Sequence, residues 1–465
     1  MTEPTELAEL SATRLREEYA ARGLSPVEVT EAVLRRADVL EPRLHALYAA
    51  DPDAARAAAK ASEQRWQAGT PLGPVDGIPL TLKENIATEG TPVPLGTAAT
   101  TLRPATEDAP AAARIRESGG VLIGKTTMPD YGMLTSGLSS FHAAARNPWD
   151  TERTPGGSSA GAGAAAAAGY GPLHVGTDIG GSIRLPAGWC GLVGLKPSFG
   201  RVPVDPPFLG RVAGPMTRTV ADAALLMEVL SGADVRDHLS LPPEELSWHD
   251  LDRQLDGLRV GLQLDPGIGL DVEPAVRDAV TAAARLFEAH GAIVENVDPF
   301  LTRDMLDGLD RFWRARAWAD MAALTEQRRA TVLPYIAEWA SGGARLSGVE
   351  VYRGFTRIDT ISVAALRATG AYDLVLSPAC PVSAPAADAA SPTGDPARPF
   401  EHIVFTLPYN MSGQPAVSLN CGYTPEGQPV GLQIAGRRFD DLGVLRAAAA
   451  FERVRPQQRP WPGGF

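Results

Sequence analysis

The sequence predicts an α/β fold, because short apolar segments of period two alternate along the chain with longer segments of helical periodicity. Residues 258–264 alternate as a strand, residues 273–290 collect apolar side chains on one helical face, and residues 293–297 form another strand. A strand, a helix and a second strand in succession are typical of α/β proteins. Residues 416–421 and 430–434 flank a short turn and predict a β-hairpin.

The composition is that of an ordinary soluble globular protein, with 44% hydrophobic and 21% charged residues among 465. A formal net charge of −12 argues against nucleic acid as a main partner. The chain has no run of about 18 apolar residues and no apolar leader after its acidic start, so we expect neither a membrane span nor a signal peptide. The widely spaced Cys190, Cys380 and Cys421 predict buried thiols in a reducing, cytoplasmic compartment rather than a metal site.

The first 70 residues predict a helical segment that supports the rest of the fold. Apolar side chains near one side of residues 5–20 indicate an amphipathic helix. Ser25 and Glu28 form a capping box around Pro26, which predicts a helix from there to about residue 40. The alanine-rich residues 52–68 predict a further helix.

A predicted strand at residues 78–82 ends at a lysine. Ile78, Leu80 and Leu82 alternate with period two, and Lys83 follows directly. A lysine at the end of an apolar strand is partly desolvated, which lowers its pKa. Because a neutral amine accepts a proton from a hydroxyl, Lys83 is a candidate general base.

Two Gly-Gly-Ser clusters, at 156–158 and 180–182, place Ser158 and Ser182 24 residues apart. Glycine-rich turns present runs of backbone N–H groups that hold an anion, and a serine beside them supplies a hydroxyl. Acyl transfer needs this combination of a nucleophile and an oxyanion hole. The Ala- and Gly-rich residues 159–169 predict a helix that begins at the first cluster, and residues 174–177 predict a strand that leads into the second.

Residues 119–126 match the phosphate-binding pattern G-x-x-x-x-G-K-[ST], and we interpret this match as chance. The residues between the glycines, Val121-Leu122-Ile123, predict a buried strand rather than a loop. A phosphate cradle opens a helix, whereas Met128-Pro129 follows Thr126 here. We therefore expect no nucleotide at this segment.

The remaining segments continue the α/β pattern. Residues 303–370 are predicted to be helical throughout and are rich in aromatic side chains, which indicates either a core stripe or a pocket for the leaving-group side of a substrate. These aromatic residues are Trp313, Trp318, Tyr335, Trp339, Tyr352 and Phe355. We also expect helices at 109–118, 217–230 and from 441 onward, strands at 192–195 and 372–376, and an irregular segment at 238–258.

Taken together, the segments around the candidate residues resemble the amidase signature family. The resemblance is dense over 74–220 and looser over 372–436. It implies a single amidase domain over 1–465, with a large mixed β-sheet between layers of α-helices, a signature core at 74–220, the helical segment 1–70 and a variable substrate-side region at about 303–370. The matching segments are Leu82-Lys83-Glu84-Asn85, Pro155-Gly156-Gly157-Ser158-Ser159, residues 176–184 and residues 191–197.

The resemblance implies that Ser182 is the nucleophile, Ser158 a bridging serine and Lys83 the base, with no metal or other cofactor. The proton of Ser182 passes through Ser158 to Lys83 during attack on a carbonyl, and water later hydrolyses the acyl-enzyme. Substrate contacts are expected from Gly132 and Met133, and an ion pair from Asp178 and Arg184. The expected oxyanion hole consists of the backbone N–H groups of Ile179, Gly180, Gly181 and Ser182, and the expected loop supports are Ser159, Thr177, Asp178 and Arg184.

Two other functions stay open at this point. Residues 157–161 fit the G-x-S-x-G pattern of α/β-hydrolases with Ser159 as nucleophile, although the polar segment before them is not the strand that this elbow requires. The A subunit of the glutamine-dependent tRNA amidotransferases shares the signature and works in a complex. Residues 198–207 lack the longer Ser- and Asp-containing stretch that we expect of that protein.

The expected substrate is a small-molecule amide with an aryl or otherwise hydrophobic group, because residues 130–150 and 303–370 indicate a roomy apolar pocket. Cleavage of a carbamate (urethane) or an ester is the alternative within the family. The resemblance is also compatible with a homodimer.

Overall fold

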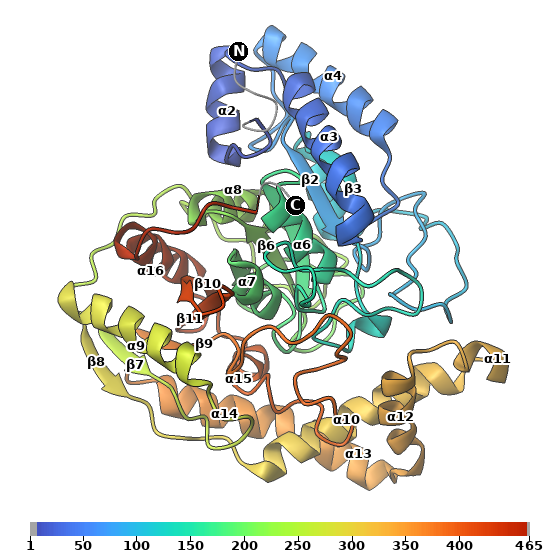
Figure 1. The fold of residues 1–465 in the computed structure, drawn as a ribbon, viewed down its shortest axis with the longest axis vertical. Helices are drawn as coiled ribbons and strands as arrows, with labels where there is room; N and C mark the ends of the chain where they lie inside the picture. Colours follow the sequence, from blue (N-terminus) through green and yellow to red (C-terminus); the bar gives the residue numbers. More distant parts are fainter. Residues whose placement is uncertain (1–6, 463–465) are drawn as a thin grey trace.

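The fold is organised around one eleven-stranded β-sheet (Figure 1). The computed structural model describes residues 7–462. Its strands are β1 (Leu47–Tyr48), β2 (Pro79–Lys83), β3 (Val121–Thr126), β4 (Leu173–Asp178), β5 (Val193–Lys196), β6 (Val212–Thr217), β7 (Arg259–Leu262), β8 (Ile293–Asn296), β9 (Leu374–Pro378), β10 (Ala416–Tyr423) and β11 (Pro429–Gly436).

Helices connect most of these strands. The α-helices are α2 (Ala12–Ala21), α3 (Pro26–Leu44), α4 (Pro52–Ala68), α5 (Pro110–Glu117), α6 (Ala160–Ala168), α7 (Arg184–Cys190), α8 (Val220–Leu230), α9 (Pro274–Ala289), α10 (Arg303–Ala322), α11 (Glu326–Arg329), α12 (Pro334–Ser341), α13 (Gly348–Phe355), α14 (Arg357–Thr369), α15 (Leu407–Met411) and α16 (Asp441–Val454). Short 3₁₀ helices are η1 (Asp130–Gly132) and η2 (Gly342–Arg345).

The sheet mixes parallel and antiparallel neighbours, in the order β1-β3-β2-β4-β6-β5-β10-β11-β9-β7-β8. β2 is parallel to both β3 and β4, whereas β4 is antiparallel to β6. Leu82 of β2 lies opposite Val175 of β4, so the two strands end at the same edge of the sheet. This edge carries Lys83 and the loop that begins at Asp178.

Helices cover both faces of the sheet, which confirms the predicted sandwich. α7 and α16 both pack on β10 and β11, yet α7 contacts α6 whereas α16 contacts α8 and α9. The two groups therefore lie on opposite faces of the sheet. In Figure 1, α2, α3 and α4 lie at the top beside β2 and β3, and the α10–α14 region lies at the bottom.

Several predicted elements form for the reasons that the sequence indicated. Glu28 accepts the backbone N–H of Ser25 and completes the capping box at the start of α3. Thr219 caps α8, with its side chain accepting the backbone N–H of Asp222. The Ala- and Gly-rich segment forms α6, all of whose residues are buried, because small side chains permit a close approach to the sheet.

Other predictions need correction. The chain is not one continuous helix over 5–20, because Ser11 caps a helix that begins only at Ala12; residues 5 and 6 lie outside the described residues. The region 303–370 consists of five α-helices and one 3₁₀ helix with short non-helical segments between most of them, so it is largely helical but not helical throughout. β6 is absent from the predicted strands, because Gly214 and Pro215 interrupt any strand pattern, although it lies between β4 and β5 in the middle of the sheet.

The segment with the phosphate-binding pattern is a strand, as predicted. It forms β3, and the described chain does not open a helix directly after Thr126. Lys125 is buried and donates hydrogen bonds to the carbonyl oxygen of Ile86 and to Oγ1 of Thr88. Its ammonium group is thus engaged within the protein.

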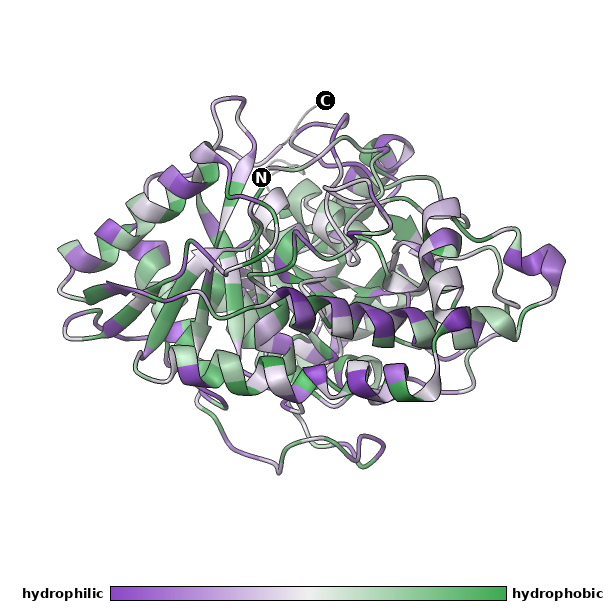
Figure 2. Cartoon of the chain, turned by 90° about the horizontal axis from the view of Figure 1, so that it is seen from below, coloured by the Kyte–Doolittle hydropathy of each residue, from purple (hydrophilic) through white to green (hydrophobic). Residues whose placement is uncertain are grey.

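Hydropathy follows this layered arrangement. In Figure 2 the strands of the sheet are largely hydrophobic, whereas the helices in the foreground alternate hydrophobic and hydrophilic residues. Cys190, Cys380 and Cys421 are all buried free thiols, as predicted. Within residues 7–462, no helix combines the length and the apolar character needed to cross a bilayer.

Candidate active site

Lys83 ends β2 with a fully buried side chain, 0% of which is exposed. Its Nζ is hydrogen-bonded to Oγ of Ser158 at 2.8 Å and to Oγ of Ser159 at 3.1 Å. Burial, and secondarily the positive charge of Arg211, lowers the pKa of Lys83 to about 7, against an opposing effect of Asp178. A substantial fraction of this lysine is therefore neutral near pH 7 and able to accept a proton.

The two Gly-Gly-Ser clusters lie against each other. The backbone N–H of Ser159 donates to the carbonyl oxygen of Ser182 at 3.2 Å. Oγ of Ser159 donates to the carbonyl oxygen of Thr177 at 3.2 Å and accepts its N–H at 3.3 Å. The Gly157–Ser158 peptide bond is cis. Ser159 and Thr177 therefore join the first cluster to the end of β4.

Ser182 lies at the end of the loop after β4 and is partly exposed. The backbone N–H of Gly181 donates to Oδ1 of Asp178 at 2.8 Å, so it is not free for a substrate oxygen. The prediction that the N–H of Gly181 belongs to the oxyanion hole is therefore wrong. The N–H groups of Ile179, Gly180 and Ser182 have no acceptor within residues 7–462 and remain available to an oxyanion.

A buried ion pair holds this loop, as predicted. Nη2 of Arg184 lies 2.9 Å from Oδ1 of Asp178, and both side chains are fully buried. The Asp178 carboxylate also accepts the N–H of Ile183 at 3.1 Å. Burial alone raises the pKa of this carboxyl, but the charge and hydrogen bonds of Arg184 outweigh burial and lower the pKa well below its usual range. Asp178 is thus ionised and orders the residues around Ser182.

The C-terminal part of the chain completes the support of the loop, which sequence patterns did not reveal. Arg184 donates from Nη1 to the carbonyl oxygen of Thr406 at 2.8 Å and to Oε1 of Gln433 at 2.7 Å. Nδ2 of Asn410 donates to Oδ1 of Asp178 at 2.8 Å. These partners lie more than 200 residues from Arg184 and Asp178 in the sequence, so no local spacing of residues predicts them.

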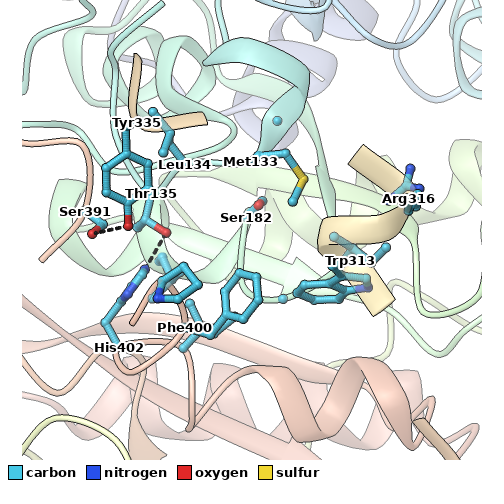
Figure 3. Close-up of a pocket in the computed structure, with 16 residues that line it drawn as sticks. Met133, Leu134, Thr135, Ser182, Trp313, Arg316, Tyr335, Ser391, Phe400 and His402 are labelled. Carbon is cyan, nitrogen blue, oxygen red and sulfur yellow. Dashed lines mark hydrogen bonds between the residues drawn. The ribbon is translucent and has the colours of Figure 1, made fainter. Parts of the chain in front are cut away.

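One cavity beside Ser182 is largely apolar, and we call it the apolar cavity. It encloses about 570 Å³, including space open to solvent, and its apolar lining includes Met133, Leu134, Trp313 and Phe400. Figure 3 shows the Ser182 hydroxyl among Met133, Phe400 and Trp313, with Tyr335 and Arg316 on opposite sides of it. At one end, Nε2 of His402 is hydrogen-bonded to Oγ1 of Thr135 at 2.7 Å and Tyr335 to Ser391 at 3.2 Å.

A second cavity also reaches Ser182, and we call it the arginine cavity. It encloses about 1310 Å³, including open solvent, and its lining includes Ser158, Arg211, Arg316, Asp205 and Asp320. Gly132 and Met133 line both cavities, where the sequence placed a substrate contact. Of the aromatic residues at 303–370, Trp313 lines both cavities and Tyr335 the apolar one, whereas Tyr352 is 68% exposed.

The geometry does not match an α/β-hydrolase. Ser159 follows a turn rather than a strand, and no histidine of the described chain is hydrogen-bonded to it. Burial lowers the pKa of both His174 and His402 to about 3, so these rings are uncharged. Within residues 7–462, no group of three or more His, Cys, Asp or Glu side chains is arranged to hold a metal ion.

Comparisons with known proteins identify relatives over nearly the whole chain. Residues 28–445 match the sequence model of the family described as Amidase. An acylamidase from Rhodococcus erythropolis is 36% identical over 459 aligned residues, which cover 96% of each chain. The A subunit of the glutamyl-tRNA(Gln) amidotransferase from Chloroflexus aurantiacus is 34% identical over 494 aligned residues, which cover 98% of this chain and 99% of that one.

Solved structures of related enzymes have the same fold over nearly the whole chain. A bacterial aryl acylamidase of the amidase signature family superposes with a TM-score of 0.88 at 32% identity, over 96% of each chain. The 6-aminohexanoate cyclic dimer hydrolase superposes with a TM-score of 0.89 at 26% identity, over 99% of this chain and 100% of that one. The chain therefore belongs to the amidase signature family and is a hydrolase of amide C–N bonds.

Proposed function

We propose that the protein hydrolyses an aryl or hydrophobic amide through an acyl-enzyme on Ser182. Ser158 takes the proton of Ser182 during attack and passes its own proton to neutral Lys83. The N–H groups of Ile179, Gly180 and Ser182 stabilise the oxyanion. The observation that carries this proposal is the fully buried Lys83, hydrogen-bonded at 2.8 Å to Ser158 beside the cavity that contains Ser182.

The two parts of the substrate occupy different cavities in this proposal. Ser158 must return a proton to the leaving amine, and among the two cavities it lines only the arginine cavity. The leaving amine therefore belongs in the arginine cavity. The acyl group then belongs in the apolar cavity, where Trp313 and Phe400 offer aromatic surface.

The apolar cavity supports a hydrophobic acyl group rather than a short polar one. Apart from Ser182 and Arg316, which also line the arginine cavity, its polar side chains lie in hydrogen-bonded pairs, Nε2 of His402 with Thr135 and the hydroxyl of Tyr335 with Ser391. Carbamates and esters also present a carbonyl to Ser182. An alkoxide or aryloxide leaves more readily than an amine, so the same site is expected to cleave them.

A role within an amidotransferase complex is less well supported. At least 29 of the 494 positions aligned with the amidotransferase chain have no residue in this 465-residue chain. The alignment with the acylamidase covers 96% of this chain in only 459 positions. The alignment with the acylamidase thus needs fewer gaps, which supports an amidase rather than an amidotransferase subunit.

Turnover by the purified single chain tests the proposal. Wild type, Ser182→Ala and Lys83→Ala are compared on 4-nitroacetanilide, a 4-nitrophenyl ester and an aryl carbamate. We expect Ser182→Ala to abolish turnover and Lys83→Ala to lower kcat by about 10²–10⁴-fold near neutral pH.

The control is Ser231→Ala, which removes a hydroxyl that donates to the carbonyl oxygen of Met227 and lines neither cavity. Full activity in Ser182→Ala would contradict the assignment of the nucleophile. A folded wild type that is inactive alone, but releases ammonia from glutamine when partner proteins are added, would favour the amidotransferase function.

A further inference from the structure

The arginine cavity contains two positive charges that amide hydrolysis itself does not require. Arg211 lies immediately before β6, and Arg316 lies on α10. Both line the cavity that holds Ser158 and Ser182, and both are half-buried. Arg316 also borders the apolar cavity, on the side of Ser182 that faces away from Tyr335 in Figure 3.

Neither guanidinium forms a direct ion pair within residues 7–462. Arg211 donates one hydrogen bond, from Nη1 to the carbonyl oxygen of Pro206 at 3.3 Å. The guanidinium carbon of Arg316 lies 4.0 Å over the ring of Phe208, and the group donates no hydrogen bond to the described chain. Because a guanidinium carries five N–H donors, most donors of this pair are unused.

The two charges also act on each other. Burial lowers the pKa of Arg211, and the charge of Arg316 lowers it further. Asp205 offsets part of this effect on Arg211, and Asp320 does so on Arg316, but neither carboxylate reaches ion-pair distance. An anion that accepts hydrogen bonds from both guanidinium groups relieves this repulsion and uses the free donors.

We propose that Arg211 and Arg316 bind an anionic group, a carboxylate above all, on the amine part of the substrate. The inference rests on the proposed function, which assigns the leaving amine to the arginine cavity. The acyl part stays uncharged because the apolar cavity that receives it is lined mainly by apolar side chains, and Arg316 borders it where the two cavities meet. The substrate class is thus an amide that releases an amino acid or an aminoarene carboxylate.

Matched anilides test this inference. The substrates are 4-acetamidobenzoate, its neutral analogue 4-acetamidobenzamide, and the cationic 4-acetamidobenzylamine. We expect wild type to favour the carboxylate over the neutral analogue in kcat/KM by about tenfold or more, as for hydrogen bonds to a charged group. In Arg316→Gln this ratio is expected to fall to near one, whatever happens to the absolute rate.

Two variants separate recognition from other effects. Arg311→Gln removes the same charge from the same helix at a position that lines neither cavity, so the ratio is expected to persist. Arg211→Lys keeps a positive charge near Lys83 but loses the planar fork, so the ratio is expected to fall while the pH dependence of turnover is kept.

The outcomes distinguish this inference from the proposed reaction. Hydrolysis of all three anilides without preference, or with preference for the cation, overturns the inference and leaves the reaction intact; the second result would assign recognition to Asp205 and Asp320. If wild type hydrolyses none of them, calorimetric titration of the Ser182→Ala protein with 4-acetamidobenzoate tests binding directly. Binding that Arg316→Gln abolishes supports the anion site without the reaction, and no binding overturns the inference.

Discussion

The Nζ atom of Lys83 lies 2.8 Å from Oγ of Ser158, in a position where no part of the lysine reaches solvent. In the proposed mechanism the neutral amine of Lys83 is the base, and burial lowers its pKa to about 7, so protonation at acid pH removes the base. We expect kcat/KM to rise with pH through about 7 and to level above it. The measurement is a pH profile at constant ionic strength, and a profile that is flat across neutrality would contradict the role of Lys83.

The charge of Arg211 is expected to set part of this pH dependence. It is the second cause of the lowered pKa of Lys83, after burial. Arg211→Gln removes a repulsive charge from the protonated lysine, so the midpoint of the pH profile is expected to move upward. Arg211→Lys keeps the charge and serves as the matched control. Equal midpoints in the two variants would show that Arg211 does not act on Lys83.

Truncation of Asn410 is expected to weaken both the fold and the catalytic loop. Its side chain donates to Asp178 at 2.8 Å and to the carbonyl oxygen of Gly210 at 3.1 Å, and it is almost fully buried. Asn410→Ala leaves these buried partners short of a donor, which costs about 1–3 kcal/mol in the free energy of unfolding. Denaturant unfolding measures that loss, and kcat is expected to fall with it.

The control for this change is Asn296→Ala at the exposed end of β8, where we expect a change within about 0.5 kcal/mol. An Asn410→Ala protein as stable and as active as wild type would mean that Arg184 and the backbone N–H groups suffice to hold the Asp178 carboxylate.

Two adjacent glycines of the loop are expected to differ sharply in tolerance to alanine. Gly181 has φ +133, and a Cβ atom there lies 2.6 Å from Oγ1 of Thr406 and 2.7 Å from a methyl group of Leu185. A Cβ atom on Gly180 lies 3.1 Å from the terminal methyl of Ile403, which is able to move. Gly181→Ala is thus expected to lower the free energy of unfolding by about 1–3 kcal/mol and to remove most of kcat. Gly180→Ala is expected to lower both quantities much less. Equal effects on unfolding and turnover would contradict this interpretation of the loop.

Phe400 is expected to determine how well large acyl groups bind. Its ring packs edge-on against Trp313 at 5.0 Å between centroids and lines the apolar cavity. Phe400→Ala removes apolar contact, so kcat/KM for a hexanoyl anilide is expected to fall about tenfold relative to that for acetanilide. Phe312→Ala, on α10 but lining neither cavity, is the control. A fall of the same size for both substrates would point to general damage instead.

The sequence predicts those features whose signal is local. The β2 strand that ends at Lys83, the small-residue helix α6 and the capping box of α3 each follow from a few consecutive residues. The Asp178–Arg184 ion pair is also predictable, because both residues flank Ser182 within one loop.

The features that escape prediction depend on contacts between distant segments. Asn410 and Gln433 reach Asp178 and Arg184 only after β10 and β11 join the sheet beside β5. The side chain of Arg316 belongs to a helix whose periodicity does not say which cavity it borders. The prediction for the N–H of Gly181 is wrong because spacing alone does not reveal that Asp178 accepts its hydrogen bond.

The order in which the ribosome releases the chain determines when the contacts of Arg184 can form. Lys83, Ser158 and Ser182 all emerge in the first half of synthesis, but the Asn410 oxygen that Arg184 binds follows 226 residues later. Until that segment has left the exit tunnel, the loop that carries Ser182 lacks part of its support. A nascent or prematurely terminated chain therefore carries the three proposed catalytic side chains before the supports of the Ser182 loop are in place, and we expect hydrolytic activity only once the last strands have folded.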